Sequence, residues 1–272
     1  MSGYLALIRI NLKLAARERA VLFFNYILPL LFFFGFAQVF GGGPGPTTRL
    51  TATVLIFGVL GSGLYGAGIR TVAEREANIL RRYKVAPISP APILVASIVT
   101  GWIVFMPAVL LILALAHFVY AMPFPVRWPS LLILVSLGII ALRAVGLIVA
   151  SVVNSVAESN ILIQLMYMPM LFLSGAIFPI AIMPAWAQTI SHFLPTSYLA
   201  SGIQGMILRG ESLMQNAIAA LALIAATGIA LLVSVKLFRW EKEEQIGREA
   251  KLWLLAVFLP FLILGVYTAW SG

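Results

Sequence analysis

Seven long apolar stretches limit what this chain of 272 residues can fold into. They lie at about 20–40, 51–72, 92–119, 130–154, 159–178, 213–237 and 252–270. A helix needs about 20 mostly apolar residues to cross a bilayer, and these stretches have about that length. Hydrophobic residues make up 62% of the chain and charged residues only 10%, unlike the composition of soluble domains. The sequence therefore predicts an all-α integral membrane protein with seven transmembrane helices.

Lysine and arginine fall mostly on one side of these predicted spans. If the N-terminus is cytoplasmic and the spans alternate in direction, only Arg49, Arg127 and Arg209 lie in outer loops. Basic residues favour the cytoplasmic side of a membrane. We therefore expect a multi-pass protein of the plasma (inner) membrane with a cytoplasmic N-terminus. The inner loops explain the net charge of +9, so this charge does not indicate a nucleic-acid partner.

Residues 4–18 have the pattern of an amphipathic helix rather than that of a span. Apolar residues share one face, and basic residues recur at intervals of four on another. The two faces hold Tyr4, Ile8, Leu12 and Ala15, and Arg9, Lys13 and Arg17, respectively. Such a helix lies along the inner membrane surface, in contact with lipids.

Prolines divide the apolar segment after residue 178 into pieces too short to cross a bilayer. Pro179, Pro184 and Pro195 leave pieces of about ten residues. We expect these pieces to enter the outer leaflet and return, as a re-entrant segment before the sixth span. Backbone at that depth must be covered by protein or line a wet cavity. An ordinary outer loop lying on the membrane is the alternative.

Several motifs that suggest enzymes lack the context that their chemistry needs. The stretch GSGLYG matches a dinucleotide-binding pattern, but it lies inside a predicted span with no strand before it. Gly58, Ser62 and Gly66 instead form a small-residue stripe for close helix packing. With no Asp, no Cys, two His residues and no G-x-x-x-x-G-K-[ST] loop, the sequence predicts no metal, cofactor or ATPase site. A Ser–His pair with His192 is the one catalytic site that remains conceivable.

Arg143 is the one ionisable residue deep within a predicted span. An arginine at the centre of a span costs about 3 kcal/mol on insertion scales, which the surrounding Leu, Ile and Val residues offset. Arg143 either contacts an anionic group of a substrate or pairs with carbonyl groups or a polar neighbour such as Gln164. No Asp or Glu lies at similar depth, which argues against a carrier driven by protons or sodium ions.

Three segments together resemble the ABC-2 type permease family: the amphipathic N-terminal helix, AEREANILRRYKVAPISPAPILVAS and LFLSGAIFPIAIMPAWAQTISHFLPTSYLASGIQGMILRG. The resemblance covers residues 1–240, which we expect to form one ABC-2 type transmembrane domain with six spans. It implies an exporter subunit that pairs with a second copy of itself or a similar permease. Two separate ABC ATPase subunits would bind ATP and Mg²⁺, so this chain needs no cofactor. Residues 241–272 depart from the family, as a charged linker and a seventh helix at 252–270.

The charged loop between the second and third predicted spans would be the coupling helix of this family. Its expected contacts to the ATPase are Glu74, Arg75, Glu76, Arg81, Arg82 and Tyr83. A charged helix at the membrane face suits docking in a polar groove of a soluble partner. We also expect Arg143 and Gln164 on the substrate path, and Phe178 and Trp186 at its outer gate because their side chains are large enough to plug a narrow exit.

The sequence therefore predicts the permease subunit of an ATP-binding cassette exporter rather than an enzyme. Its expected substrate is a drug, a lipid or a polysaccharide-like compound. A secondary carrier or channel without an ATPase partner is the alternative, and an intramembrane hydrolase is a third hypothesis.

Overall fold

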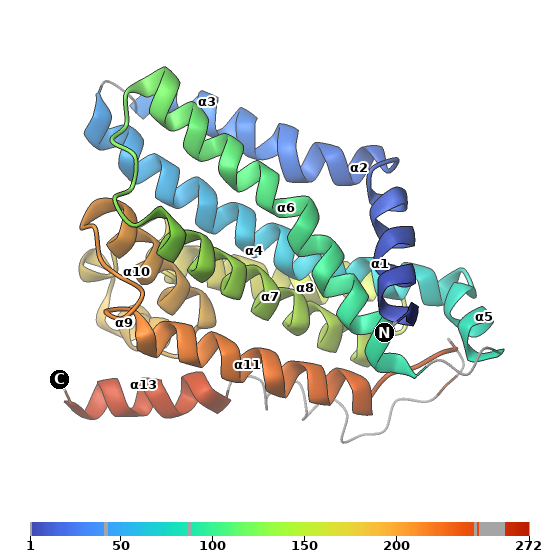
Figure 1. Ribbon diagram of the computed structural model, residues 1–272. Helices are drawn as coiled ribbons and strands as arrows, with labels where there is room; N and C mark the ends of the chain where they lie inside the picture. Colours follow the sequence, from blue (N-terminus) through green and yellow to red (C-terminus); the bar gives the residue numbers. More distant parts are fainter. Residues whose placement is uncertain (1, 41–42, 86–88, 242–243, 245–258, 272) are drawn as a thin grey trace.

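The computed structural model describes residues 2–40, 43–85, 89–241, 244 and 259–271, and every regular element in these residues is a helix (Figure 1). The all-α prediction is thus confirmed. In chain order the helices are α1 (Ser2–Ala15), α2 (Arg19–Leu22), the π-helix η1 (Phe23–Ile27), α3 (Leu28–Phe40), α4 (Pro44–Glu76), α5 (Ile79–Val85), α6 (Pro90–Tyr120), α7 (Trp128–Val152), α8 (Val156–Leu173), the 3₁₀-helix η2 (Ile180–Ile182), α9 (Ala185–Ser191), α10 (Pro195–Leu208), α11 (Ala217–Lys236) and α13 (Leu259–Ser271).

Five helices are long and apolar enough to cross a membrane, namely α4, α6, α7, α8 and α11, and they match five of the seven predicted spans. The first predicted span is divided among α2, η1 and α3, and its apolar part, Asn25–Val39, is shorter than a full span. Of the seventh predicted span only α13 can be described, because residues 252–258 lie outside the described part of the chain.

Prolines mark where several long helices begin. Pro44, Pro90, Pro129 and Pro195 lie in the first turns of α4, α6, α7 and α10. A proline there has no backbone N–H to leave unpaired, and its fixed φ angle already suits a helix. The prolines therefore favour the start of α4, α6, α7 and α10 at these positions.

Helix α7 lies at the centre of the bundle and packs closely against α4. A Cβ atom added at Gly146 of α7 would lie 2.7 Å from the carbonyl oxygen of Leu64, and one added at Gly68 of α4 would lie 2.8 Å from that of Gly146. Glycines of this kind let two membrane helices approach closely. All residues from 141 to 152 of α7 are buried between α4 and the other helices that surround α7.

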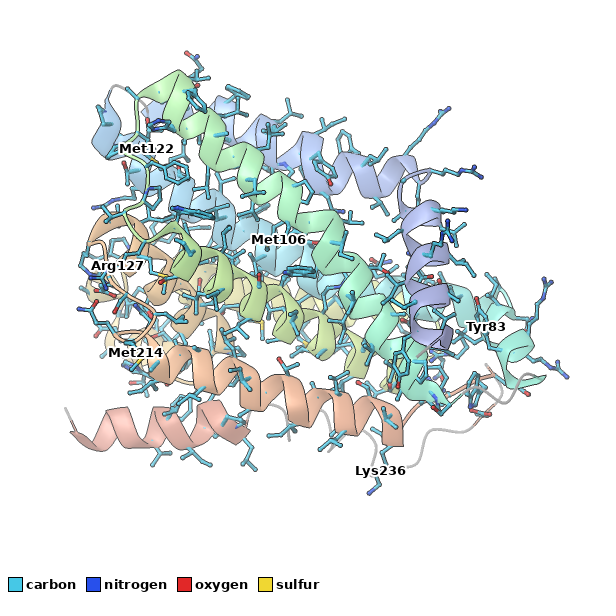
Figure 2. All side chains as sticks on the ribbon, in the orientation of Figure 1. Tyr83, Met106, Met122, Arg127, Met214 and Lys236 are labelled. Atoms are coloured by element: carbon cyan, nitrogen blue, oxygen red, sulfur yellow. The ribbon has the colours of Figure 1, made fainter. Side chains whose placement is uncertain are left out.

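The bundle has two ends, which we call the α5 end and the α9 end after the short helices found there. Helix α1 crosses the α5 end transverse to the long helices (Figure 1). Figure 2 shows Tyr83 and Lys236 at this end, and Met122, Arg127 and Met214 at the α9 end. The long helices therefore run between one end that carries the α5 segment and another that carries the proline-rich segment.

Candidate functional site

Helix α5 is short, and one buried leucine positions it. It spans only Ile79–Val85, and an isolated helix of seven residues is not stable in water. Asn78, with a φ of 57°, turns the chain sharply after α4, and asparagine tolerates this left-handed conformation. Leu80 is fully buried in a small core with Leu7 of α1 and Ala96 of α6. This leucine therefore fixes how α5 lies on the bundle.

Two arginines of α5 face outward at the α5 end. The side chain of Arg81 is 65% exposed, and Arg82 is also exposed. Nε of Arg81 lies 3.9 Å from Oε1 of Glu241, a distance at which a solvated pair contributes little stability. The exposed face of α5 is therefore basic.

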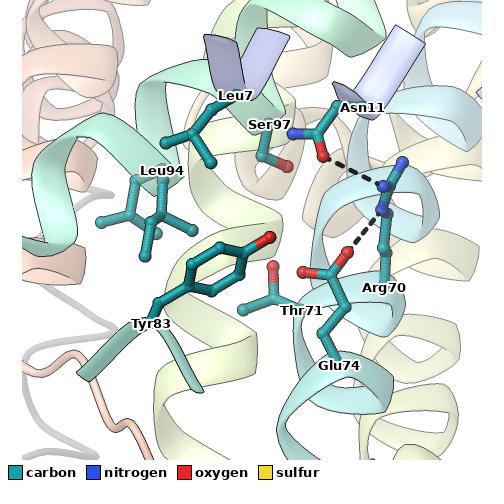
Figure 3. A pocket seen from close by; sticks show the side chains of 9 residues that line it. Leu7, Asn11, Arg70, Thr71, Glu74, Tyr83, Leu94 and Ser97 are labelled. Carbon is teal, nitrogen blue, oxygen red and sulfur yellow. Dashed lines mark hydrogen bonds and ion pairs between the residues drawn. The ribbon is translucent and has the colours of Figure 1, made fainter. Parts of the chain in front are cut away.

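Glu74 and Tyr83 line a small polar pocket between α1, α4, α5 and α6 (Figure 3). Nε of Arg70 lies 2.9 Å from Oε1 of Glu74, and Nη2 of Arg70 donates to Oδ1 of Asn11 at 3.3 Å. Glu76 points elsewhere, and its Oε1 accepts a hydrogen bond from the first backbone N–H of α8 at 3.2 Å. Both acidic residues of the loop are therefore engaged within the chain.

Two buried arginines meet at the turn between α7 and α8. Nη1 of Arg75 donates to the carbonyl oxygen of Ala150 at 2.8 Å, and Nη2 donates to that of Val153 at 2.6 Å. Arg239, which follows α11, donates to the same Val153 carbonyl and, at 3.0 Å, to Oδ1 of Asn154. Burial of its guanidinium lowers the pKa of Arg239. Because carbonyl groups at a helix C-terminus carry partial negative charge, both cations are stabilised there.

The six residues expected at the coupling contact thus divide into two groups. Arg81 and Arg82 are exposed on α5. The other four are buried or half-buried and form contacts within the chain that support α5 and the end of α4; they are Glu74, Arg75, Glu76 and Tyr83.

Arg143 and Gln164, expected together on a substrate path, have different partners. Arg143 is only 6% exposed, and its Nη1 and Nη2 donate to the carbonyl oxygens of Ser62 at 3.1 Å and Ser97 at 3.2 Å. The exposed side chain of Gln164 instead accepts a hydrogen bond from the hydroxyl of Tyr65. The structure therefore pairs Arg143 with carbonyl groups, one of the two interpretations that the sequence left open, and not with Gln164.

The predicted small-residue stripe faces α6, η1 and Arg143. A Cβ atom added at Gly58 would lie 3.1 Å from a phenylalanine ring of α6, and one at Gly66 would lie 2.5 Å from Nη1 of Arg143. Ser62 Oγ donates to Oδ1 of Asn25 in η1 at 2.8 Å. The stripe therefore makes room for neighbouring side chains, whereas Gly63 and Gly68 of α4 lie against the backbone of α7.

Phe178 and Trp186, the residues expected at an outer gate, lie in the segment that connects α8 to α10. Their side chains are 50% and 63% exposed. Phe178 precedes η2 and Trp186 lies in α9, which Figure 1 shows at the opposite end of the bundle from α5. Each therefore presents a large apolar surface outside the chain's own core.

Helix α10 is too short to cross a bilayer, yet it is largely buried against α4 and α7. Nε2 of Gln204 donates to the carbonyl oxygen of Gly175 at 2.8 Å, and Oγ1 of Thr196 donates to that of Met170 at 3.1 Å. Side chains of α10 thus pair backbone groups at the end of α8, as backbone at membrane depth requires.

Sequence reasoning missed two supports of the α5 segment. Ile79 and Leu80 are two adjacent apolar residues between Glu76 and Arg81, which was the available signal for an anchor. Arg239 resembles any basic residue after a span, and nothing local in the sequence indicates that it is buried beside Arg75.

The described residues contain no group of three or more His, Asp or Glu side chains that could hold a metal ion. Oγ of Ser191, the serine next to His192, donates to the carbonyl oxygen of Gln188 at 2.6 Å rather than to the imidazole ring.

Together, five apolar helices of spanning length, a transverse N-terminal helix and a basic helix at one end define a multi-pass membrane protein. The sequence profile of the ABC-2 type transporter family matches residues 3–208. The chain belongs to this family, and the resemblance seen in its sequence is confirmed.

Curated relatives agree with this assignment. The inner membrane transport permease YhhJ of Escherichia coli (strain K12) is 27% identical over 144 residues, which cover 53% of this chain and 38% of YhhJ. YbhS of the same strain, named a probable multidrug ABC transporter permease, is 23% identical over 176 residues, or 64% of this chain and 46% of YbhS. The chain thus spans less than half of these two relatives. YvfS of Bacillus subtilis (strain 168), which its name describes as a transport permease, is 22% identical over 76% of this chain and 86% of its own length.

Proposed function

We propose that this chain is the membrane-spanning permease subunit of an ATP-binding cassette exporter of the inner membrane. The observation that carries the proposal is the exposed basic face of α5, held on the bundle by the buried side chain of Leu80. An ATP-driven permease whose sequence has no phosphate-binding loop must receive mechanical work through a contact with its ATPase. A charged surface suits specific docking to such a partner. The partner is a separate ABC ATPase in two copies, which binds ATP and Mg²⁺.

In this proposal residues 1–240 form the ABC-2 domain with six spans and a cytoplasmic α5 end. The first span consists of α2, η1 and α3, which follow one another without a break from residue 19 to residue 40. Two features support the assignment of α1 as an interfacial helix and of α10 as a re-entrant helix. Helix α1 crosses the bundle at the α5 end, as an interfacial helix would, and α10 is covered by α4 and α7, as a re-entrant helix would be.

A second copy of the chain would complete the substrate path along α8. This helix is the least enclosed of the five spans, and Ile161 and Leu165 on it are 70% and 69% exposed. Gln164 lies between them and bonds Tyr65 on the same surface. A polar pair is costly against lipid, so it fits a path between subunits better than a lipid-facing surface. Phe178 and Trp186 then meet their copies as the outer gate, while buried Arg143 lies behind the path.

The substrate class is proposed from the relatives. YbhS and YbhR are both named as probable multidrug ABC transporter permeases, so drug-like compounds are the first class to test. Lipids and polysaccharide-like compounds follow, because the exposed side chains of Ile161, Gln164 and Leu165 on α8 combine apolar and polar groups.

Reversing the two exposed arginines tests the proposed function. We expect Arg81→Glu/Arg82→Glu to weaken ATPase binding by at least about tenfold, since a mismatched charge across an interface costs several kcal/mol. The measurement is co-purification of the ATPase and ATP-driven drug transport in proteoliposomes. Lys13→Glu/Arg17→Glu is the matched control, because it reverses two exposed charges of α1 at the same end. Equal ATPase binding and transport by the wild type and the α5 variant would contradict the proposal.

A secondary carrier or channel is the alternative, and the same preparation separates it from the exporter. An exporter transports only when ATP is hydrolysed, whereas a carrier or channel moves solute down its gradient without the ATPase. Solute flux by the permease alone, unchanged when the ATPase and ATP are added, would favour the alternative.

We also propose that α13 is part of a seventh span that ends outside the cell. The rings of Phe261 and Tyr198 lie 5.6 Å apart, and a Cβ atom added at Gly265 would lie 2.6 Å from the ring of Phe193. Helix α13 therefore packs against α10 and against Phe193, two residues before α10, and its C-terminus lies at the α9 end (Figure 1).

Cysteine labelling tests this topology, because the natural chain contains no cysteine. An impermeant maleimide added to intact cells should label Ser271→Cys, whereas Ala73→Cys at the α5 end should be labelled only after the cells are opened. Labelling of Ser271→Cys that also requires opened cells would place the C-terminus inside.

A further inference from the structure

Arg143 is held by the same short motif on two different helices. Ser62 and Gly66 of α4, and Ser97 and Gly101 of α6, both have the spacing S-x-x-x-G. In each case the carbonyl oxygen of the serine accepts a hydrogen bond from the Arg143 guanidinium, at 3.1 Å and 3.2 Å. One side chain of α7 therefore joins the main chains of α4 and α6.

The two glycines make this contact possible. A helical side chain covers the turn before its own Cα atom, so the residue at position i+4 normally shields the carbonyl group of residue i. A Cβ atom added at Gly66 would lie 2.5 Å from Nη1 of Arg143, and one at Gly101 would lie 1.8 Å from its Cζ atom. Any other residue at position 101 would displace the guanidinium. The serine carbonyls can accept it because a carbonyl oxygen has two lone pairs, only one of which is used within the helix.

Stability alone does not account for this arrangement. Nε of Arg143 is buried and has no hydrogen-bond partner among the described residues. A buried charge is costly, and apolar residues of similar volume often replace buried ionic groups without loss of stability. The contact of Arg143 with α4 and α6 instead restricts the motion of these helices relative to each other.

We infer that Arg143 clamps α4 and α6 into one rigid body that moves when the α5 segment is pushed. The two clamped helices flank this segment, because α4 leads into α5 and the chain after α5 leads into α6. Without the clamp, a force on α5 could separate the end of α4 from the start of α6 and be lost as local deformation. Arg143 is thus a positioning residue for transport; this inference rests on the proposed function.

A distance measurement tests the clamp without the ATPase. Spin labels at Ala73→Cys on α4 and Ser89→Cys before α6 occupy exposed positions at the α5 end. In the purified full-length permease we expect a narrow distance distribution for the wild type and a broader one for Arg143→Met. Gly101→Ala should broaden it as well, because the added methyl group displaces the guanidinium while the arginine remains. This second variant decides the question if Arg143→Met does not fold. The control is Gly228→Ala on α11, where an added Cβ atom would meet nothing within 4 Å.

Transport provides the second measurement. Coupling free energies between sites typically correspond to factors of about 5–150, so transport per ATP hydrolysed should fall at least about fivefold in both variants. Gly101→Ala should add little in the Arg143→Met background, because the displaced group is already absent. Wild-type distances and transport ratios in both variants would overturn the clamp. Absence of ATP-driven transport in the wild type would instead contradict the proposed function, and the distance measurement would remain valid.

Discussion

Replacing Leu80 with alanine should release α5 from the bundle and reduce ATP-driven transport at least about tenfold. Leu80 is fully buried, and replacing a buried leucine with alanine typically costs about 2–5 kcal/mol. A helix of seven residues has little stability of its own to set against this loss. Each 1.4 kcal/mol changes an equilibrium about tenfold, so the docked conformation of α5 should lose most of its population. Drug transport per ATP hydrolysed by the assembled complex is the measurement.

The matched control for this variant is Leu14→Ala. Leu14 lies on α1 at the same end of the bundle, but its side chain is 52% exposed, so the same substitution removes little buried surface. Both variants should insert normally, because neither residue lies in one of the five spanning helices. If Leu80→Ala transports as well as Leu14→Ala, the anchoring role of Leu80 is wrong.

The spanning helices were predictable from the sequence because the length of an apolar stretch is set by the thickness of the bilayer. The same rule explains where the prediction was incomplete. Polar Asn25 and Tyr26 lie in η1, within the first apolar stretch, and both bond other backbone groups, at Val21 and Val104. The apolar part of that stretch, Asn25–Val39, begins at these two residues and is shorter than a full span.

The candidate site was less predictable because α4 continues beyond its apolar residues. Its 33 residues correspond to about 50 Å of helix, whereas the hydrocarbon core is about 30 Å thick. The residues that appear in the sequence as a charged loop, Glu74 and Glu76 among them, are therefore the last turns of a long helix and have neighbours within the chain. The hydrogen bonds of Arg75 and Arg239 to the carbonyl oxygen of Val153 join distant parts of the sequence, which no local pattern encodes.

Replacing Arg75 with methionine should destabilise the α5 end by about 3 kcal/mol. Arg75 makes two hydrogen bonds to carbonyl oxygens, at 2.8 Å and 2.6 Å, and a hydrogen bond to a charged group contributes about 1.5–3 kcal/mol. Relief from burying the charge offsets part of this loss. Thermal unfolding in detergent should therefore occur at a lower temperature, and amide hydrogen exchange in residues 153–156 should be faster than in the wild type. Arg17→Met, which removes an exposed arginine of α1, should change stability by less than about 0.5 kcal/mol.

A double-mutant cycle with Arg239 distinguishes a shared site from two independent contacts. Arg75 and Arg239 both donate to the carbonyl oxygen of Val153, so either one alone still pairs that group. Each single substitution also removes the repulsion between two nearby cations, which lowers its apparent cost. Both effects reduce the loss of stability in each single variant. The free energy of unfolding lost in Arg75→Met/Arg239→Met should therefore exceed the sum of the losses in the single variants. Additive losses within about 0.5 kcal/mol would mean that the two arginines act independently. In that case the carbonyl oxygen of Val153 would not couple α4 to the segment after α11.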